Sequence, residues 1–370
     1  MSTTTNNIYE RYNRQILLKL FGEKSQHQLL SAKVLVIGAG GLGCPVLLYL
    51  AGAGIGTIGI MDDDRVTLSN LNRQLLYTSQ DIGFFKAERS SFALQQLNPD
   101  IQIKEYSIRL TTTNAFEILT GYDIIIDCTD NFSSRYLIND VCVLLKKPLI
   151  YGSIYQFEGQ VAVFNCQGKN GISTANYRDL FPQPPGEQEV PSCNEAGVIG
   201  VVPGIIGTMM ATECIKLIIG IGKLLINQLL IYNALNNQIS KYDLEAKAET
   251  RNLIPANSEA FKEMQYDLPC AAEPSFTELT VTEFNQLMQE KDTIVIDVRE
   301  KNEQPSITAF RHINLPMSLL KKGVPLIKEK NILLFCHSGI RSSKAVLLFS
   351  NGQNKVYHLK GGIIKWMAQN

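Results

Sequence analysis

The chain has 370 residues, and its 35 Lys and Arg residues balance its 35 Asp and Glu residues, so the formal net charge is zero. A balanced charge argues against a protein that binds nucleic acid through a strongly basic surface. Apolar residues make up 45% and charged residues 19% of the chain, which is typical of a soluble globular protein, and the length favours two domains.

The eight cysteines are scattered and the N-terminal residues show no signal-peptide pattern, so we expect a cytoplasmic protein with reduced thiols. Residues 198–221 form a strongly apolar segment, but Pro203, Glu213 and Lys216 interrupt it. We therefore expect a buried helix there and no membrane insertion.

The first predicted elements surround a glycine-rich loop. A helix at Tyr9–Leu20 carries Arg14, which its spacing alone would leave as a solvated arginine. An apolar strand at Val34–Ile37 runs into the loop, an apolar helix follows, and a second strand, Thr57–Met61, ends at Asp62. The loop glycines are Gly38, Gly40, Gly41 and Gly43.

This is the G-x-G-x-x-G pattern in a strand–turn–helix context, with an acid about 20 residues further on. Glycines let the backbone approach a phosphate closely, and the start of the helix offers unpaired N–H groups to it. The carboxylate of Asp62 is placed to accept the hydroxyls of a ribose. The pattern therefore predicts a nucleotide site.

Strands and helices continue to alternate as far as Ser153, which predicts a doubly wound parallel α/β sheet. Ligands of such sheets lie beyond the carboxyl ends of the strands, where the glycine loop, Asp62 and Asp130 all fall. The further predicted elements are a helix at Lys86–Leu97, strands at Ile101–Tyr106 and Asp123–Asp127, a helix at Phe132–Leu145, and strands at Pro148–Ser153, Gln160–Asn165, Asn227–Tyr232 and Ile239–Leu244.

The glycine pattern alone fits NAD, FAD or ATP. Arg73 and Lys86 favour ATP, because a triphosphate with developing charge needs more cations than a dinucleotide does. Asp130 is a carboxylate of the kind that holds Mg²⁺ together with substrate phosphates. No His beside an Arg stands out as a partner for hydride transfer. We predict ATP and Mg²⁺, with a redox dinucleotide as an alternative.

Residues 11–243 resemble the ubiquitin-activating-like adenylyltransferases of the MoeB and ThiF type. The resemblance is carried by RYNRQ at 11–15, GAGGLG at 38–43, DDDRVTLSNLNRQ at 62–74, Lys86, DCTDN at 127–131 and CNEAGVIG at 193–200. Together with the glycine motif it implies nucleotide binding by Gly38, Gly40, Gly41, Gly43, Asp62, Ser69, Asn70, Leu71, Asn72, Arg73, Gln74, Lys86, Asp130 and Asn131.

The resemblance further implies a homodimer in which Arg14 reaches the nucleotide of the partner subunit. The implied substrate is the C-terminal glycine carboxylate of a small ubiquitin-like sulfur-carrier protein ending in Gly-Gly. The carboxylate attacks the α-phosphate and gives an acyl adenylate and pyrophosphate. Because a carboxylate needs no general base, positioning and neutralisation of phosphate charge carry this reaction.

Relatives of this type usually carry two Cys-x-x-Cys pairs that bind a structural zinc ion. Here Asn176 and Asp179 stand in place of the first pair, and residues 251–257, where the second is expected, contain no Cys. Because a structural zinc needs four N or S ligands, we predict no zinc. Cys193 follows a proline-rich segment, and the family makes it an acyl acceptor or a disulfide partner; the alternative is a buried apolar thiol.

A second α/β segment begins near Ser275. Its loop at Cys336–Arg341 lies between a predicted strand and a helix, where amides and a helix start favour a thiolate or persulfide. A Cys336–His337 protease pair is disfavoured, because the side chains of adjacent residues rarely meet. The segment resembles a rhodanese domain through DVRE at 297–300, CHSGIRS at 336–342 and Gly361-Gly362, although its GHIPGA motif is shortened at 311–314. The resemblance implies a persulfide on Cys336, held by His337, Ser338, Gly339, Ile340 and Arg341.

We therefore predict a Rossmann-like adenylyltransferase domain at residues 8–245, a linker at 246–275 and a rhodanese-like α/β domain at 276–370. Arg14, Arg73, Lys86 and Asp130 would serve adenylation, and Cys336 would supply the sulfur that gives a thiocarboxylate, for molybdopterin, thiamine or tRNA thiolation. The sulfur donor would be a cysteine desulfurase or another persulfide source. The alternative is a conjugation-type activator with a thioester on Cys193 and a rhodanese half used for docking.

Overall fold

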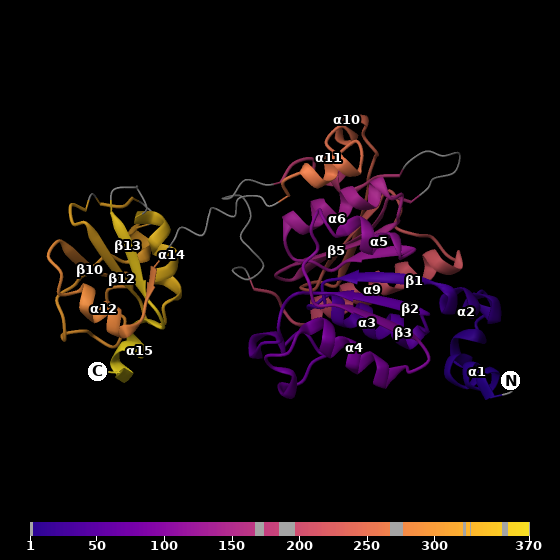
Figure 1. Ribbon diagram of the computed structural model, residues 1–370, viewed down its shortest axis with the longest axis horizontal. Coiled ribbons are helices and arrows are strands. Elements are labelled where there is room, and N and C mark those ends of the chain that lie inside the picture. Colours follow the sequence, from indigo (N-terminus) through magenta and orange to yellow (C-terminus); the bar gives the residue numbers. More distant parts are fainter. Residues whose placement is uncertain are drawn as a thin grey trace. The chain divides into compact units, whose positions relative to one another are not determined.

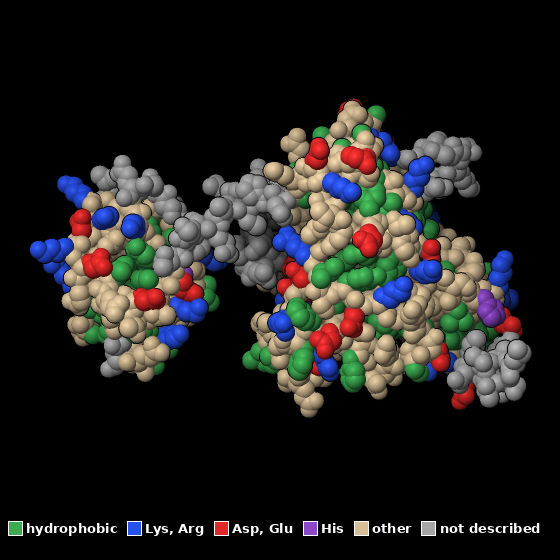
Figure 2. Space-filling model, in the orientation of Figure 1, with side chains coloured by type: hydrophobic (Ala, Val, Ile, Leu, Met, Phe, Trp, Pro, Cys, Tyr) green, Lys and Arg blue, Asp and Glu red, His purple; other side chains and the backbone are tan. Residues whose placement is uncertain are grey.

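The computed structural model describes residues 3–166, 174–184, 197–266, 277–320, 323–325, 327–349 and 354–369. The chain divides into two compact units, Met1–Leu268 and Pro269–Asn370, each with its own sheet (Figure 1). On the face drawn in Figure 2, basic and acidic side chains of the first unit are interspersed.

The first unit is built on an eight-stranded sheet with the order β3-β2-β1-β4-β5-β6-β7-β8. The strands from β3 to β5 are parallel, and those from β5 to β8 are antiparallel. The strands are β1 (Lys33–Ile37), β2 (Thr57–Met61), β3 (Gln102–Tyr106), β4 (Ile124–Asp127), β5 (Leu149–Tyr155), β6 (Glu158–Phe164), β7 (Gln228–Asn233) and β8 (Gln238–Asp243).

Helices cover both faces of this sheet, which explains why its central strands are apolar throughout. Val34 and Val36 of β1 point into one core, and Leu35 and Ile37 point into the other. The first core is covered by α2 (Gly22–Ser31), α3 (Gly43–Ala53), α4 (Lys86–Leu97) and α9 (Val201–Ile219), and the second by α5 (Ala115–Thr120), α6 (Phe132–Leu144), α7 (Tyr177–Leu180) and α11 (Ser258–Glu263).

Helix α9 is long and apolar enough to cross a membrane by length and composition alone. Its residues Val202, Ile206 and Met210 are fully buried in the first core. A Cβ added to Gly207 would lie 2.5 Å from Cγ of Pro45, so α9 and α3 pack closely. This packing is that of a core helix, as the sequence predicted.

The N-terminal region holds two helices, where the sequence predicted one at Tyr9–Leu20. Helix α1 (Thr3–Ile16) is followed by α2. Tyr12 is buried against Gly54, and its hydroxyl accepts a hydrogen bond from Nδ2 of Asn98 at 2.8 Å. Gly54 and Asn98 end α3 and α4 on the side of the sheet where the parallel strands begin, called here the amino edge. Helix α1 therefore lies at the edge opposite to the glycine loop.

The linker predicted at 246–275 is too long, because much of this range is folded onto the first unit. Helices α10 (Ala248–Arg251) and α11 occupy it, and Phe261 is fully buried in the second core. The hydroxyl of Tyr266 donates to Oδ2 of Asp140 at 2.8 Å. The folded part of the first unit thus extends to residue 266, and residues 267–276 are outside the described residues.

The second unit has a five-stranded parallel sheet with the order β11-β10-β12-β13-β9. The shortened motif at 311–314 forms the two-residue edge strand β11. The elements are β9 (Thr277–Leu279), α12 (Val281–Leu287), β10 (Thr293–Asp297), β11 (Ile313–Asn314), α13 (Met317–Leu320), β12 (Asn331–Phe335), α14 (Ile340–Phe349), β13 (Lys355–Leu359) and α15 (Gly362–Gln369).

Candidate functional site

A cavity of about 700 Å³ lies at the carboxyl ends of the central strands of the first unit. It sits where β1 has β2 on one side and β4 on the other, the point at which ligands bind to doubly wound sheets. Its lining includes most of the predicted nucleotide-binding residues, namely Gly38, Gly40, Gly41, Asp62, Ser69, Asn72, Arg73, Gln74, Lys86, Asp130 and Asn131.

The four loop glycines divide into two roles. Gly38 has a φ of +94°, and a Cβ there would lie 2.8 Å from the carbonyl oxygen of Cys128. A Cβ on Gly43 would lie 2.0 Å from the carbonyl oxygen of Gly38, so this glycine lets the helix start tightly under the loop. Gly40 and Gly41 line the cavity itself. Gly38 thus lets the loop pass close to the residue after β4, Gly43 lets α3 start close to the loop, and the other two glycines present bare backbone to a ligand.

Asp62 is fixed at the end of β2 by backbone donors. Its Oδ2 accepts the N–H of Ala39 at 2.7 Å, and its Oδ1 accepts the N–H of Asp64 at 2.9 Å. Burial raises the pKa of Asp62 above its usual range, and the charge of Lys86 opposes this shift. The Nζ of Lys86 lies 2.7 Å from Oδ2 of Asp64, whose side chain is exposed. A buried ammonium group and a carboxylate therefore share one wall of the cavity.

Arg73 also lines the cavity and follows a short turn of the chain. Its Nη1 donates to the carbonyl oxygen of Ser69 at 2.9 Å and to Oδ1 of Asn72 at 3.1 Å. The turn η1 (Leu68–Asn70) is closed by Oδ1 of Asn70, which accepts the N–H of Thr67 at 3.1 Å. Asn70 and Leu71, predicted to bind the nucleotide, do not line the cavity; they belong to the turn that positions Arg73.

The loop after β4 brings Asp130 and Asn131 to the cavity. Asp130 is exposed there, whereas Asn131 caps α6 through Oδ1, which accepts the N–H of Ser134 at 2.9 Å. Arg135, which the sequence did not single out, also lines the cavity; it is buried, and its Nη2 donates to the carbonyl oxygen of Thr129 at 3.1 Å. In the sequence, only its position one turn after the residue that caps α6 could have indicated that Arg135 faces the cavity.

Two groups of oxygen donors at this cavity suit Mg²⁺. One is the exposed carboxylate of Asp130. The other is the run Asp62, Asp63 and Asp64, whose carboxylates each offer an oxygen within 4.8 Å of the others.

Arg14 does not line this cavity. It is exposed on α1, which packs through Tyr12 at the amino edge of the same sheet. Within one chain, Arg14 and the glycine loop therefore lie at opposite edges of the sheet.

The residues in place of the zinc pairs form a hydrogen-bond cluster, called here the Asp179 clasp. Oδ2 of Asp179 accepts from N and Nδ2 of Asn176 at 2.8 and 2.7 Å. Its Oδ1 accepts the N–H of Lys247 at 2.9 Å and the hydroxyl of Thr250. The clasp contains no thiol or imidazole, and both carboxylate oxygens already accept hydrogen bonds, so these residues do not fit a zinc site.

The predicted persulfide loop follows β12 in the second unit. Cys336 is 0% exposed, and its Sγ accepts the N–H of Gly339 at 3.1 Å, with Oγ of Ser342 at 3.5 Å. A Cβ on Gly362 would lie 2.6 Å from the carbonyl oxygen of Cys336, and the N–H of Ile363 donates to that oxygen at 2.8 Å. The double glycine therefore lets the start of α15 close tightly on the cysteine loop. Cys193 lies outside the described residues.

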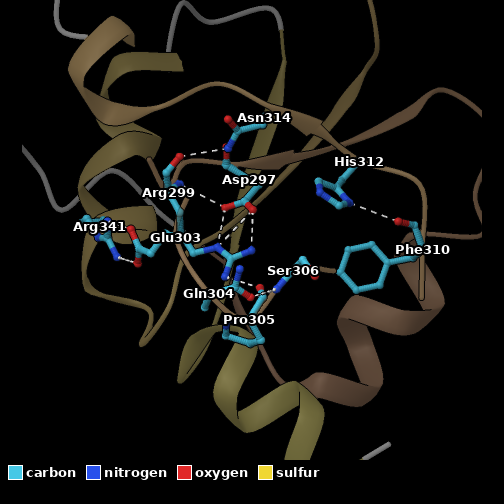
Figure 3. A network of polar contacts seen from close by, with 10 residues as sticks. All are labelled: Asp297, Arg299, Glu303, Gln304, Pro305, Ser306, Phe310, His312, Asn314 and Arg341. Atoms are coloured by element: carbon cyan, nitrogen blue, oxygen red, sulfur yellow. Dashed lines mark hydrogen bonds and ion pairs between the residues drawn. The ribbon is translucent and has the colours of Figure 1, made fainter. Parts of the chain in front are cut away.

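Figure 3 shows two arginine–carboxylate pairs of the second unit, one of which includes Arg341, the last residue of this loop. Nη1 of Arg341 is 2.7 Å from Oε2 of Glu303, and its Nη2 contacts the other oxygen. The buried Arg299 binds Asp297 through Nε at 2.9 Å and Nη2 at 2.7 Å, and its Nη1 donates to the carbonyl oxygen of Pro305. The guanidinium predicted to hold the persulfide is thus engaged by a carboxylate.

Comparison with known proteins agrees with this two-part arrangement. The model of the ThiF family matches residues 12–253, and the model of the rhodanese-like domain matches residues 280–369. The probable adenylyltransferase/sulfurtransferase MoeZ of Mycobacterium tuberculosis is 39% identical over 97% of this chain and 93% of its own length. The sulfur carrier protein adenylyltransferase of Thermus thermophilus is 51% identical over 63% of this chain and 86% of its own.

The adenylyltransferase and sulfurtransferase MOCS3 of Arabidopsis thaliana is 35% identical over 97% of this chain and 83% of its own. A crystal structure of E. coli MccB with ATP superposes with a TM-score of 0.54 at 21% identity, covering 66% of this chain and 78% of that one, which shows a shared fold. With both family models and relatives that extend over nearly the whole length, this chain belongs to the ThiF family and carries a C-terminal rhodanese-like domain.

Proposed function

We propose that this protein adenylates the C-terminal glycine of a ubiquitin-like sulfur-carrier protein and then converts it to a thiocarboxylate with sulfur from a Cys336 persulfide. The observation that carries this proposal is the presence, in one chain, of a cavity lined by a glycine loop and of a cysteine whose Sγ accepts the N–H of Gly339. Relatives similar over nearly the full length are named adenylyltransferase and sulfurtransferase, which supports both halves.

Each part of the cavity has a task in adenylation. The amides around Gly40 and Gly41 receive phosphates, and Asp62 accepts the ribose hydroxyls. Lys86 and Arg73 neutralise charge that develops on the α-phosphate while the carrier carboxylate attacks. Mg²⁺, which Asp130 would help to hold, supplies further neutralisation of the phosphates when it is bound. No general base is required, because the attacking carboxylate is already ionised.

In the sulfur step, sulfur replaces AMP at the acyl carbon of the adenylate. The terminal sulfur of the Cys336 persulfide attacks the acyl adenylate, its C–S bond forms, and AMP leaves with the bonding electrons. The resulting acyl disulfide releases the thiocarboxylate when a second thiol attacks the sulfur of Cys336. Cys193 is our candidate for that thiol, and a disulfide with Cys336 is the by-product.

We further infer a homodimer, because Arg14 lies at the sheet edge opposite to the cavity of its own chain. A second copy would have to bring Arg14 to the nucleotide. The remaining assignments are a cytoplasmic location, a cysteine desulfurase or another persulfide source as donor, and a carrier that serves molybdopterin, thiamine or tRNA thiolation.

The test combines two readings on the full chain with a carrier ending in Gly-Gly. Carrier-dependent exchange of pyrophosphate into ATP reports adenylation, and the mass of the carrier C-terminus reports the thiocarboxylate. Cys336→Ala should retain the exchange and lose the thiocarboxylate. If Cys336→Ala makes product normally, while Cys193→Ala abolishes a carrier thioester, the protein is a conjugation-type activator. A purified chain that holds NAD or FAD and shows no exchange would contradict adenylation altogether.

A further inference from the structure

The ion pair between Arg341 and Glu303 is the feature of the sulfur site that the proposed function leaves unexplained. Arg341 is the last residue of the Cys336 loop and begins the helix α14 together with Ile340. Nη1 of its guanidinium donates to Oε2 of Glu303, and Nη2 donates to Oε1. The two side chains are 36% and 26% exposed, so a ligand arriving from solvent can reach the pair.

The charge of Arg341 is therefore cancelled beside the reacting sulfur. Hydrogen bonding from Arg341 holds the pKa of Glu303 below its usual range, so the carboxylate is ionised at neutral pH. Arg341 lies five residues after Cys336, in the same loop as the reacting sulfur. A guanidinium so placed would attract an anionic sulfur donor if its partner carboxylate were absent.

Two other cationic side chains of this unit are also paired with carboxylates. Arg299 is held by the buried carboxylate of Asp297, and Nζ of Lys360 lies 2.7 Å from Oε2 of Glu278. Lys360 directly precedes the double glycine that packs on the Cys336 loop. At the sulfur itself, the N–H of Gly339 donates to Sγ at 3.1 Å, and Oγ of Ser342 in α14 lies 3.5 Å from Sγ and 3.0 Å from the carbonyl oxygen of Gly339. These neutral groups suit the single charge of a persulfide.

We propose that Glu303 is a specificity-determining residue that restricts the sulfur donor of Cys336 to persulfides carried on a thiol and disfavours thiosulfate-type dianions. With a thiol persulfide, the Cys336 thiolate attacks the outer sulfur, the S–S bond breaks, and the donor leaves as a thiolate. With thiosulfate, the same attack expels sulfite, which carries two negative charges past the Glu303 carboxylate. The inference rests on the persulfide role of Cys336 in the proposed function.

The test is the rate at which one sulfur atom is added to Cys336, read by intact mass of the full chain. The two donors are thiosulfate and glutathione persulfide. Glu303→Gln frees Arg341 without changing the side-chain size, and it should speed loading from thiosulfate by about tenfold, the effect of one charge-assisted hydrogen bond. Loading from glutathione persulfide should not gain.

Two variants serve as controls. Glu303→Gln combined with Arg341→Gln should lose the gain with thiosulfate, because no guanidinium is left to bind it. Glu300→Gln removes a nearby carboxylate that contacts Ser318 rather than a guanidinium, and it should leave the donor preference unchanged. An unchanged melting temperature shows that each variant is folded.

An equal change for both donors, or a gain that survives in the double variant, would overturn the role of Glu303. Loading needs neither ATP nor carrier, so its result is independent of adenylation. A chain that loads sulfur as stated but makes no thiocarboxylate would refute the proposed function, and Glu303 would still determine the specificity for the sulfur donor. If the chain makes thiocarboxylate and Glu303→Gln leaves the donor preference unchanged, only the role of Glu303 is refuted.

Discussion

Among single residues, Asp62 combines two tasks that depend on its ionisation. Its two oxygens accept the amides of Ala39 and Asp64, which fixes the carboxylate at the mouth of the glycine loop. Burial raises the pKa of Asp62, so a proton returns to it at a higher pH than to an ordinary aspartate. A protonated carboxyl accepts fewer hydrogen bonds, from the loop and from a ribose alike.

The affinity for ATP should therefore fall as the pH is lowered toward the raised pKa of Asp62. Asp62→Asn should weaken ATP binding by about tenfold at neutral pH, since one charge-assisted acceptor is lost. The variant should also lack the part of the acidic decline that Asp62 causes. Calorimetric titration of both proteins across the acidic range measures this, and parallel pH profiles would contradict it.

How much of the site the sequence could reveal depends on how each residue reaches the cavity. Asp62 follows β2 directly and Asp130 lies three residues after β4. Parallel strands have their carboxyl ends on the same side of a sheet, so the placement of both residues at one cavity was predictable. Arg135 and Arg109 line the same cavity but come from a helix turn and a loop, whose direction depends on packing. Asn70 shows the converse: its motif position suggested a ligand contact, and its side chain closes a turn instead.

At the level of elements, the Asp179 clasp joins α7 to α10 across 71 residues of chain. A buried ion pair involves the neighbouring residue Arg178, which donates to both oxygens of Asp140 at 2.8 and 2.6 Å. Tyr266 donates to the same carboxylate. These polar contacts fasten the segment 248–266 to the first unit, where the sequence predicted a linker.

The sequence could not reveal this fastening for a physical reason. Helices α10 and α11 have four and six residues, which is too short for a 3.6-residue apolar period to show. Phe261 alone carries α11 into the core. The partners of Asp179 are distant in sequence, and hydrogen-bond donors of this kind leave no local pattern. By contrast, the long apolar helix α9 and the buried strands were predicted within a few residues.

Thr250→Val should destabilise the first unit, because it leaves a buried oxygen of Asp179 without one of its donors. The expected cost is about 1–3 kcal/mol of unfolding free energy. Thr250→Ser keeps the hydroxyl and should remain close to the original protein. Thermal unfolding followed by circular dichroism measures both, and a chelator should leave the original Tm unchanged. A Tm lowered by chelation, or one zinc per purified chain, would show that a metal holds this region instead.

For the whole molecule, the placement of α1 at the amino edge makes Arg14 and Asp130 members of different sites within one chain. If two copies complete each other, Arg14→Ala and Asp130→Ala should each abolish pyrophosphate exchange. Mixing the two inactive variants under subunit exchange should restore about a quarter of the sites, as expected for a symmetric dimer.

The control for this mixture is either variant mixed with itself, which should stay inactive. Both variants should still add sulfur to Cys336, since that site lies in the other unit. Activity in either single variant, or no recovery despite proven subunit exchange, would contradict an arginine supplied by the partner.

The anchoring of Tyr266 has a consequence for how far the sulfur can travel. Only residues 267–276 join the last anchored side chain of the first unit to β9. Fully extended, a segment of this length spans at most about 35 Å. Because both units belong to one chain, the proposed reaction of Cys336 with the acyl adenylate need not await the encounter of two separate proteins. In the proposed function, this covalent connection would favour sulfur transfer to the acyl adenylate over its loss to water.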